Sequence, residues 1–133
     1  IAVAFFMPVI VYLADAIGTQ TEAVTVRGLS LCRTPIRQLV AGELKTGLLI
    51  GTILGALIFP FAFIVFGDLG LAAAAGIATV LAGGMATSIG FILPLLFSRM
   101  GMDPALESGP VATILQDILS LLVYFIVVML LVF

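Results

Sequence analysis

Two long stretches without a charged residue constrain this chain more than any other feature. Residues 46–67 and 69–98 contain no Asp, Glu, Lys or Arg. A helix needs about 20 mainly apolar residues to cross a bilayer, so each stretch is long enough to span one. Only a short turn around Asp68 separates them, and such a link joins antiparallel neighbours. The chain is therefore expected to fold within a membrane.

The overall composition supports this expectation and excludes other classes. Of 133 residues, 63% are hydrophobic and only 9% are charged, whereas soluble domains average about half and about a quarter. So few charges cannot cover the surface of a water-soluble fold, and so much apolar content excludes a disordered chain. The net charge of −2 excludes a nucleic-acid-binding protein. What remains is an integral membrane protein in a lipid bilayer.

Two further spans are predicted at the ends of the chain. The C-terminal segment is apolar apart from Gln116 and Asp117, and Pro110 suits the first turn of its helix. In the N-terminal segment, Pro8 and Gly18 either stay within one helix or interrupt it, which is tolerated at depth only beside protein or water. The prediction is an all-α helical bundle forming one transmembrane domain. That domain covers residues 1–133, with approximate spans at 1–28, 45–66, 70–97 and 110–133.

The basic residues indicate an orientation. Four of the five belong to the connection between the first two spans: Arg27, Arg33, Arg37 and Lys45. Arg99 lies in the connection between the last two spans. The positive-inside rule places both connections, residues 28–45 and 98–109, in the cytoplasm. An intact protein that starts in the cytoplasm is then expected to have one more span before Ile1, and the cell (inner) membrane is the expected location.

The chemistry available for a binding site is that of oxygen. The chain has no histidine and a single cysteine, so zinc, copper, haem and iron–sulfur sites are not expected. Oxygen ligands suit hard cations such as Mg²⁺ or Ca²⁺. Without histidine, no serine–histidine or histidine–aspartate catalytic pair can form, and we find no paired-aspartate motif suited to lipid phosphotransfer. We therefore expect neither an enzyme nor an organic cofactor.

Asp117 is the residue least suited to lipid. An aspartate at the centre of a spanning helix costs about 2.5–3.5 kcal/mol on insertion scales. Thr113 lies one turn before it and Ser120 three residues after it, so the three share a helix face. One interpretation is a protonated or hydrogen-bonded aspartate that holds helices together. The favoured one is a carboxylate facing a watery ion pathway, because intramembrane acids usually mark such paths.

A second polar stripe is predicted in the N-terminal segment. If this segment remains helical, Tyr12, Asp15, Gly18, Thr19 and Glu22 follow one face. For Glu22, a pathway position and a place at the cytoplasmic end of the helix are about equally plausible. For Asp15, which lies deeper, the pathway interpretation is favoured.

Small residues recur at intervals of four in the two central spans. They are Gly47, Gly51 and Gly55, then Ala72 and Gly76, and Ala86 and Gly90. Small residues at this spacing let helix backbones approach closely in lipid. The pattern predicts helix packing and says little about a specific function.

Two motifs are specific enough to indicate a family. The first is the run G-M-D-P-A-L-E-S-G-P at residues 101–110, followed by Thr113 and Asp117. The second is M-P at residues 7–8, with G-T-Q at 18–20 and V-R-G-L at 26–29. Both resemble the membrane domain of the MgtE magnesium channels and transporters, which are related to eukaryotic magnesium solute carriers. The family patterns are G-x-D-P-A-x-x-S-G-P before an acid in the pore helix, and M-P, G-x-Q and V-R-G/A-L in another helix.

The resemblance implies a fold and a pathway. It implies five spanning helices, of which this chain resembles the second to the fifth, so that the first is missing. It also implies a homodimer with a cation path between protomers, lined by the helices that are first and last here. The family's magnesium-recognising acid corresponds to Asp117, and backbone carbonyls of the pathway lie near Thr113 and Tyr12. Many members have Gly-Gly-Asn before the G-x-Q, where this chain has Asp15, Ala16 and Ile17, so Asp15 is an additional carboxylate.

The resulting hypothesis is a channel or transporter for a divalent cation, Mg²⁺ before others. The ion is expected to pass largely hydrated, because Mg²⁺ loses its water reluctantly. The predicted metal site comprises Asp117, Asp15 and Thr113, and the predicted pathway comprises Tyr12, Gly18, Thr19 and Glu22. The alternative is a sodium- or proton-coupled secondary transporter of a divalent cation or another substrate, in which the two aspartates bind the coupling ion.

Overall fold

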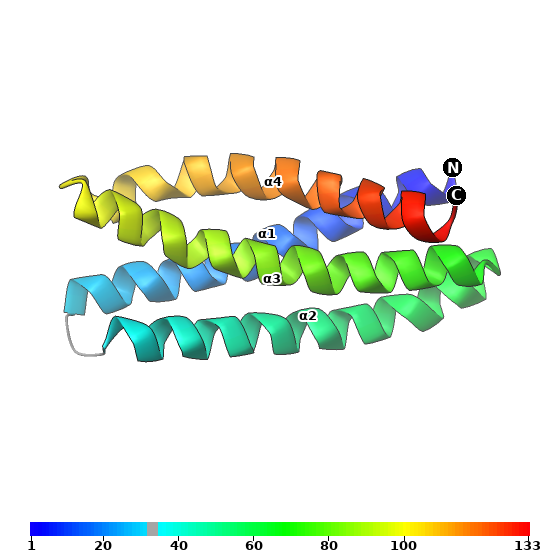
Figure 1. Ribbon diagram of the computed structural model, residues 1–133, viewed down its shortest axis with the longest axis horizontal. Helices are drawn as coiled ribbons and strands as arrows, with labels where there is room; N and C mark the ends of the chain where they lie inside the picture. Colours follow the sequence, from blue (N-terminus) through cyan, green and yellow to red (C-terminus); the bar gives the residue numbers. More distant parts are fainter. Residues whose placement is uncertain (32–34) are drawn as a thin grey trace.

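The computed structural model describes residues 1–31 and 35–133, and within these the side chains other than those of 105–108. It has four long helices: α1 (Ala2–Leu31), α2 (Ile36–Phe66), α3 (Leu69–Arg99) and α4 (Pro104–Leu131). They form an elongated bundle with both chain termini at the same end (Figure 1). Each is long and apolar enough to cross a membrane. The prediction of an all-α membrane helical bundle is confirmed.

At the prolines, the structure settles one question that the sequence left open, in α1, and moves the start of one helix, α4. α1 is continuous through Pro8 and Gly18, so neither residue interrupts it. α4 begins at Pro104 and contains Pro110 within it. Pro104 suits the first helical position because its missing N–H has no partner there and its φ is already helical. Arg33, used above for orientation, lies outside the described residues, as do the side chains in the middle of the 101–110 motif.

The connection between α2 and α3 is the tight turn that the sequence predicts. Gly67 ends α2 with a φ of 67°, and its N–H donates to the carbonyl oxygen of Phe63 at 2.8 Å. A glycine adopts this left-handed conformation without the steric cost that a side chain imposes. Asp68 then caps α3, because its Oδ1 accepts a hydrogen bond from the N–H of Leu71 at 3.1 Å. The two central spans are therefore antiparallel neighbours.

Helix α3 is the centre of the bundle. It packs against all three other helices, whereas α2 packs on α3 and to a lesser extent on α1. Figure 1 shows α3 running between α2 and α4, with α1 behind them. The buried face of α3 consists mainly of small residues, among them Ala72, Ala75, Gly76, Ala82, Gly83, Ala86 and Gly90. Such side chains let neighbouring backbones approach closely.

Glycines make the closest contacts between these helices. A Cβ on Gly55 of α2 would lie 2.7 Å from the carbonyl oxygen of Gly76 in α3. A Cβ on Gly90 of α3 would lie 2.7 Å from the carbonyl oxygen of Gly18 in α1. Neither position has room for a side chain. The small-residue spacing thus serves packing within the chain, as predicted.

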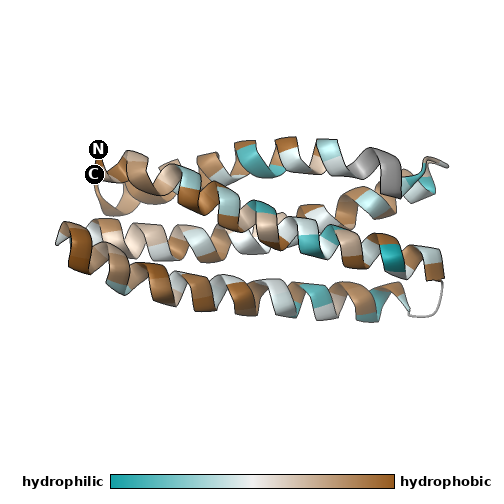
Figure 2. Cartoon of the chain, turned by 180° about the vertical axis from the view of Figure 1, so that it is seen from behind, coloured by the Kyte–Doolittle hydropathy of each residue, from teal (hydrophilic) through white to brown (hydrophobic). Residues whose placement is uncertain are grey.

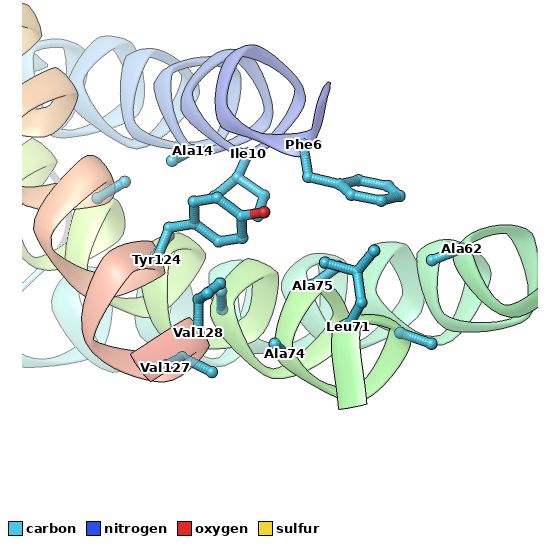
Figure 3. Close-up of a cluster of buried hydrophobic side chains, with 14 residues drawn as sticks. Phe6, Ile10, Ala14, Ala62, Leu71, Ala74, Ala75, Tyr124, Val127 and Val128 are labelled. Atoms are coloured by element: carbon cyan, nitrogen blue, oxygen red, sulfur yellow. The ribbon is translucent and has the colours of Figure 1, made fainter. Parts of the chain in front are cut away.

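A cluster of buried apolar side chains joins α1, α3 and α4 near the end that holds both termini. Figure 3 shows Phe6 and Ile10 of α1 and Tyr124 of α4 extending into the space between these helices. The Tyr124 hydroxyl donates a hydrogen bond to the carbonyl oxygen of Val3 at 2.6 Å. This bond ties the last helix to the beginning of the first, so that α1 and α4 lie side by side in opposite directions.

The outside of the bundle is apolar. Figure 2 shows hydrophobic residues along much of every helix, interrupted by hydrophilic bands. Large side chains of α2 are exposed, including Leu57, at 63%. Because no other helix of the described chain covers these side chains, a lipid bilayer is needed to keep them out of water. The protein is a multi-pass membrane protein.

Candidate cation site

A groove of about 360 Å³ lies between the first and last helices. Its walls come from α1 and α4, and the lining residues are Met7, Pro8, Val11, Tyr12, Asp117 and Leu121. Tyr12 is 73% exposed, so this wall lies on the outside of the bundle and not in its core. The two polar lining residues, Tyr12 and Asp117, therefore lie on the outer surface of the bundle, where the neighbouring surface is suited to lipid.

One acid lines this groove, and a second lies one helical turn from a lining residue. Asp117 lines it from α4, and Asp15 lies one turn after Tyr12 on α1; both are half-buried. Their carboxyl groups are close enough to interact electrostatically. Because α1 and α4 are antiparallel neighbours, the fold unites two acids from opposite ends of the sequence.

Asp15 carries a buried oxygen atom that lacks a hydrogen-bond partner. Its Oδ1 has essentially no accessible surface, and no donor in the described part of the chain reaches it. An unpaired buried carboxylate oxygen is costlier than a neutral polar atom, because the charged form loses its hydration without compensation. The charge of Asp117 adds repulsion. A cation beside the two carboxylates relieves both penalties, so the site fits a positively charged ligand.

The predicted hydroxyl and glycine positions are distributed around the acids. Tyr12 lines the groove, whereas Thr113, one turn before Asp117, and Thr19, one turn after Asp15, are exposed beyond the lining residues. Gly18 is buried, and the structure does not bring it to the groove surface.

Glu22 lies nearer to the end of the bundle that holds the connections from α1 to α2 and from α3 to α4. It is half-buried, and a Cβ on Gly109 would lie 3.5 Å from its Oε1. Seven residues separate Glu22 from Asp15, which is about two helical turns. Glu22 therefore marks one end of the contact between α1 and α4, and this position suits both interpretations given for it.

Gln116 is a residue whose importance the sequence analysis missed. It is 1% exposed, and its Nε2 donates to the carbonyl oxygen of Ala86 in α3 at 3.3 Å. Its side chain also packs directly against Gly18. The available signal was an uncharged amide in an apolar span. The apolar groove residues, such as Leu121, carry no comparable signal because apolar residues are expected throughout a span.

The arrangement suits a hard cation held by oxygen atoms. In the described residues, no group of three or more His, Cys, Asp or Glu is placed to hold a metal ion. One chain therefore offers two carboxylates and nearby hydroxyls rather than a closed cage. Fold and site together define a multi-pass membrane protein with paired intramembrane acids at a groove between its first and last helices.

Comparison with known proteins identifies the family. Residues 7–127 match the MgtE family, described as divalent cation transporter, and the chain belongs to that family. It is 38% identical over 130 residues to the magnesium transporter MgtE of Bacillus subtilis, covering 94% of this chain and 28% of that protein. It is 34% identical to the magnesium transporter MgtE of Enterococcus faecalis and 32% identical to that of Thermus thermophilus, in each case over 92% of this chain and 28% of the relative. The chain thus spans little more than a quarter of the length of these relatives.

Proposed function

We propose that the chain moves a divalent cation, Mg²⁺ before others, across the membrane along the groove between α1 and α4. The observation that carries this proposal is the buried Oδ1 of Asp15, which has no hydrogen-bond partner in the described part of the chain, together with Asp117 in the lining of the groove. The family to which the chain belongs is described as a divalent cation transporter. Its three relatives are named as magnesium transporters.

The site residues act mainly through charge and hydrogen bonding. Asp117 and Asp15 attract the cation, and Thr113 adds a hydroxyl one turn from Asp117. Because Mg²⁺ sheds its water reluctantly, these oxygen atoms hold a largely hydrated ion by accepting hydrogen bonds from its water. Two negative charges favour a doubly charged ion over a singly charged one, since the attraction scales with the product of charges.

The pathway extends along α1 in both directions from the acids. Tyr12 borders it on the side of the chain termini. Thr19 and Glu22 follow on the side of the basic connections, residues 28–45 and 98–109, which the positive-inside rule places in the cytoplasm. Gly18 contributes by keeping α1 close to α4. This orientation puts Glu22 at the cytoplasmic end of the path in the cell membrane.

A second copy of the chain completes the pore. The groove lies on the outside of one bundle, where lipid would otherwise face the carboxylate of Asp117. In a homodimer with an isologous interface, the same groove of the partner closes over it. Each acid then faces a polar, water-filled space between two protomers.

The competing function is a secondary transporter coupled to sodium or protons. The same acid pair supports it, because a proton or Na⁺ on Asp15 also relieves an unpartnered carboxylate. The substrate is then a divalent cation or another molecule, driven by the gradient of the coupling ion.

Flux into proteoliposomes tests the proposal and separates the two functions. Purified protein is reconstituted around a Mg²⁺-sensitive dye, and Mg²⁺ is added outside with membrane potential, pH and Na⁺ controlled independently. We expect uptake that follows the Mg²⁺ gradient and the potential, persists without a pH or Na⁺ gradient, and is lost in Asp117→Asn. Uptake that requires a pH or Na⁺ gradient would identify the coupled transporter instead.

A further inference from the structure

We propose that Gln116 is a positioning residue for the cation site, an assignment that rests on the function proposed above. Its amide fixes the rotation and depth of α4 against α1 and α3, and thereby holds Asp117 opposite Asp15. Gln116 touches neither the groove nor the ion in this assignment. It acts through the helix that carries the carboxylate.

Three helices meet at this side chain without spare space. The Nε2 of Gln116 donates to the carbonyl oxygen of Ala86 in α3 at 3.3 Å. On the other side the amide packs against Gly18 of α1, where a Cβ would overlap it. The carbonyl oxygen of Gly18 in turn lies against Gly90 of α3, 2.7 Å from where a Cβ of that residue would be. Gly18 of α1 therefore makes room for the amide from α4, and Gly90 of α3 makes room for the backbone of α1 at Gly18.

This junction adjoins both carboxylates. Successive residues of a helix point about 100° apart, since 3.6 residues make one turn. With Gln116 directed toward α3, the next residue, Asp117, is directed toward the boundary with α1, where the groove lies. Gly18 follows Asp15 by three residues, less than one turn. Rotation or sliding of either helix at the junction therefore changes the separation of the two carboxyl groups.

The amide of Gln116 fixes the orientation of α4 more than it adds to the free energy of unfolding. Interhelical hydrogen bonds in membranes contribute little to stability on average, and the lipid-exposed reference state offers the same side chain other partners. A leucine fills a similar volume without a polar atom to satisfy. Leucine, however, has no hydrogen-bond donor. The amide of Gln116 bonds to the carbonyl oxygen of Ala86 only within a narrow range of distance and angle, so it restricts the position of α4. Single buried amides fix helix register in this way in coiled coils.

The separation of the acids sets the preference for divalent ions. The advantage of a doubly charged over a singly charged cation is proportional to the charge of the site, so it is about twice as large when both carboxylates reach one ion as when only one does. When they are out of register, each acts as a single-charge site, and the preference for Mg²⁺ over Na⁺ declines. Loss of the amide should therefore change ion preference more than folding.

Gln116→Leu tests this assignment, with Tyr124→Phe as the matched control. Tyr124 is also buried on α4 and also joins it to another helix, through its hydrogen bond to Val3, but it lies about two turns from Asp117. Thermal unfolding of the purified chains in detergent is measured across MgCl₂ and NaCl titrations at constant ionic strength. Without Mg²⁺, we expect Gln116→Leu to unfold near the wild-type temperature. We expect it to need about tenfold more Mg²⁺ than the wild type to reach half of the maximal increase in unfolding temperature. Tenfold is the lower end of the loss in metal affinity seen when residues that orient metal ligands are substituted. Tyr124→Phe should keep the wild-type Mg²⁺ dependence.

Each outcome decides the assignment. Wild-type Mg²⁺ dependence in Gln116→Leu overturns it, and so does an equal weakening in Tyr124→Phe, because any interhelical hydrogen bond would then suffice. If Gln116→Leu does not fold, Gln116→Met, which keeps the length and flexibility of the side chain, takes its place with the same expected result. If MgCl₂ shifts the unfolding temperature of neither the wild type nor Asp117→Asn, the proposed function itself is overturned. That result differs from one in which only the Gln116 variant behaves unexpectedly.

Discussion

Asp15 of α1 and Asp117 of α4 interact electrostatically across the contact between the first and last helices. The arrangement depends on the antiparallel contact that Tyr124 and Val3 secure near the termini and that Glu22 and Gly109 mark further along. Between these two points, Asp117 lines the groove, whose other lining residues, apart from the exposed Tyr12, are apolar. A cation bound there would be held by oxygen atoms from both ends of the sequence.

Neutralising the acids one at a time should have graded effects on Mg²⁺ binding. We expect Asp117→Asn to remove most of the Mg²⁺-dependent stabilisation, which for a ligand at a hundredfold excess over Kd is about 2.7 kcal/mol. Asp15→Asn should weaken it moderately and Glu22→Gln little, because Glu22 lies about two turns from the pair. Thermal unfolding across a MgCl₂ titration, with CaCl₂ and NaCl as controls, measures all three. Equal losses in the three variants would show that the site is assigned to the wrong residues.

Asp15→Asn should also stabilise the chain when no divalent cation is present. The substitution keeps the shape of the side chain but removes the charge from an unpartnered buried oxygen and its repulsion with Asp117. We expect a higher unfolding temperature than in the wild type, because a neutral amide costs less to bury without a partner than a charged carboxylate does. Unfolding in detergent with EDTA measures it. A lower stability than wild type under these conditions would mean that the native carboxylate has a favourable partner.

Glycines that look alike in the sequence should differ sharply in their tolerance of alanine. Gly55→Ala places a methyl group 2.7 Å from the carbonyl oxygen of Gly76, so α2 must move away from α3, at a cost of about 1–3 kcal/mol. Gly42→Ala, in the same helix, meets nothing within 4 Å and should gain up to about 1 kcal/mol from helix propensity. Thermal unfolding of the two variants side by side provides the comparison. Similar behaviour would contradict the close contact between α2 and α3.

Water should reach the groove but not the outer face of α2. In a Cys32→Ser background, Tyr12→Cys is expected to react with a charged, membrane-impermeant thiol reagent in proteoliposomes, because the reactive thiolate forms only where water is present. Leu57→Cys is the control: its side chain is 63% exposed in the bundle but should be covered by lipid. Mg²⁺ should slow the reaction at Tyr12→Cys. Equal reactivity at both positions would show that the groove is no more hydrated than the lipid-facing surface.

The fold was largely predictable because each helix is marked by local composition. The charge-free stretches and the turn at Asp68 predicted α2 and α3 as antiparallel spans, and the small-residue spacing predicted their packing. It was harder to predict whether a proline begins a helix, interrupts it or lies inside it. Pro8 and Pro110 lie inside helices, because tertiary packing in a membrane bundle supports a backbone that a proline interrupts in water. The sequence left the continuity of α1 open, and the structure decided it.

The sequence indicated candidate site residues but not how they lie relative to one another. Asp117 and Asp15 stood out because charge is rare in a span. Gln116 did not, and neither did its contact with Gly18, because a helix surrounded by lipid is apolar on all sides and hydropathy gives no indication of its rotation. The side that faces a neighbouring helix and the side that faces lipid have similar composition.

By itself, the sequence determined that this protein is a membrane-embedded helical bundle of the MgtE family with acidic residues inside its apolar segments. Those properties follow from composition and short motifs, which need no long-range contact. Only the tertiary structure decided that Asp15 and Asp117 lie on neighbouring helices near one groove, that the amide of Gln116 packs against Gly18, and that one carboxylate oxygen of Asp15 is buried without a donor in the described residues. These relationships depend on how α1 and α4 are rotated against α3, which the close packing of small side chains and one interhelical amide sets.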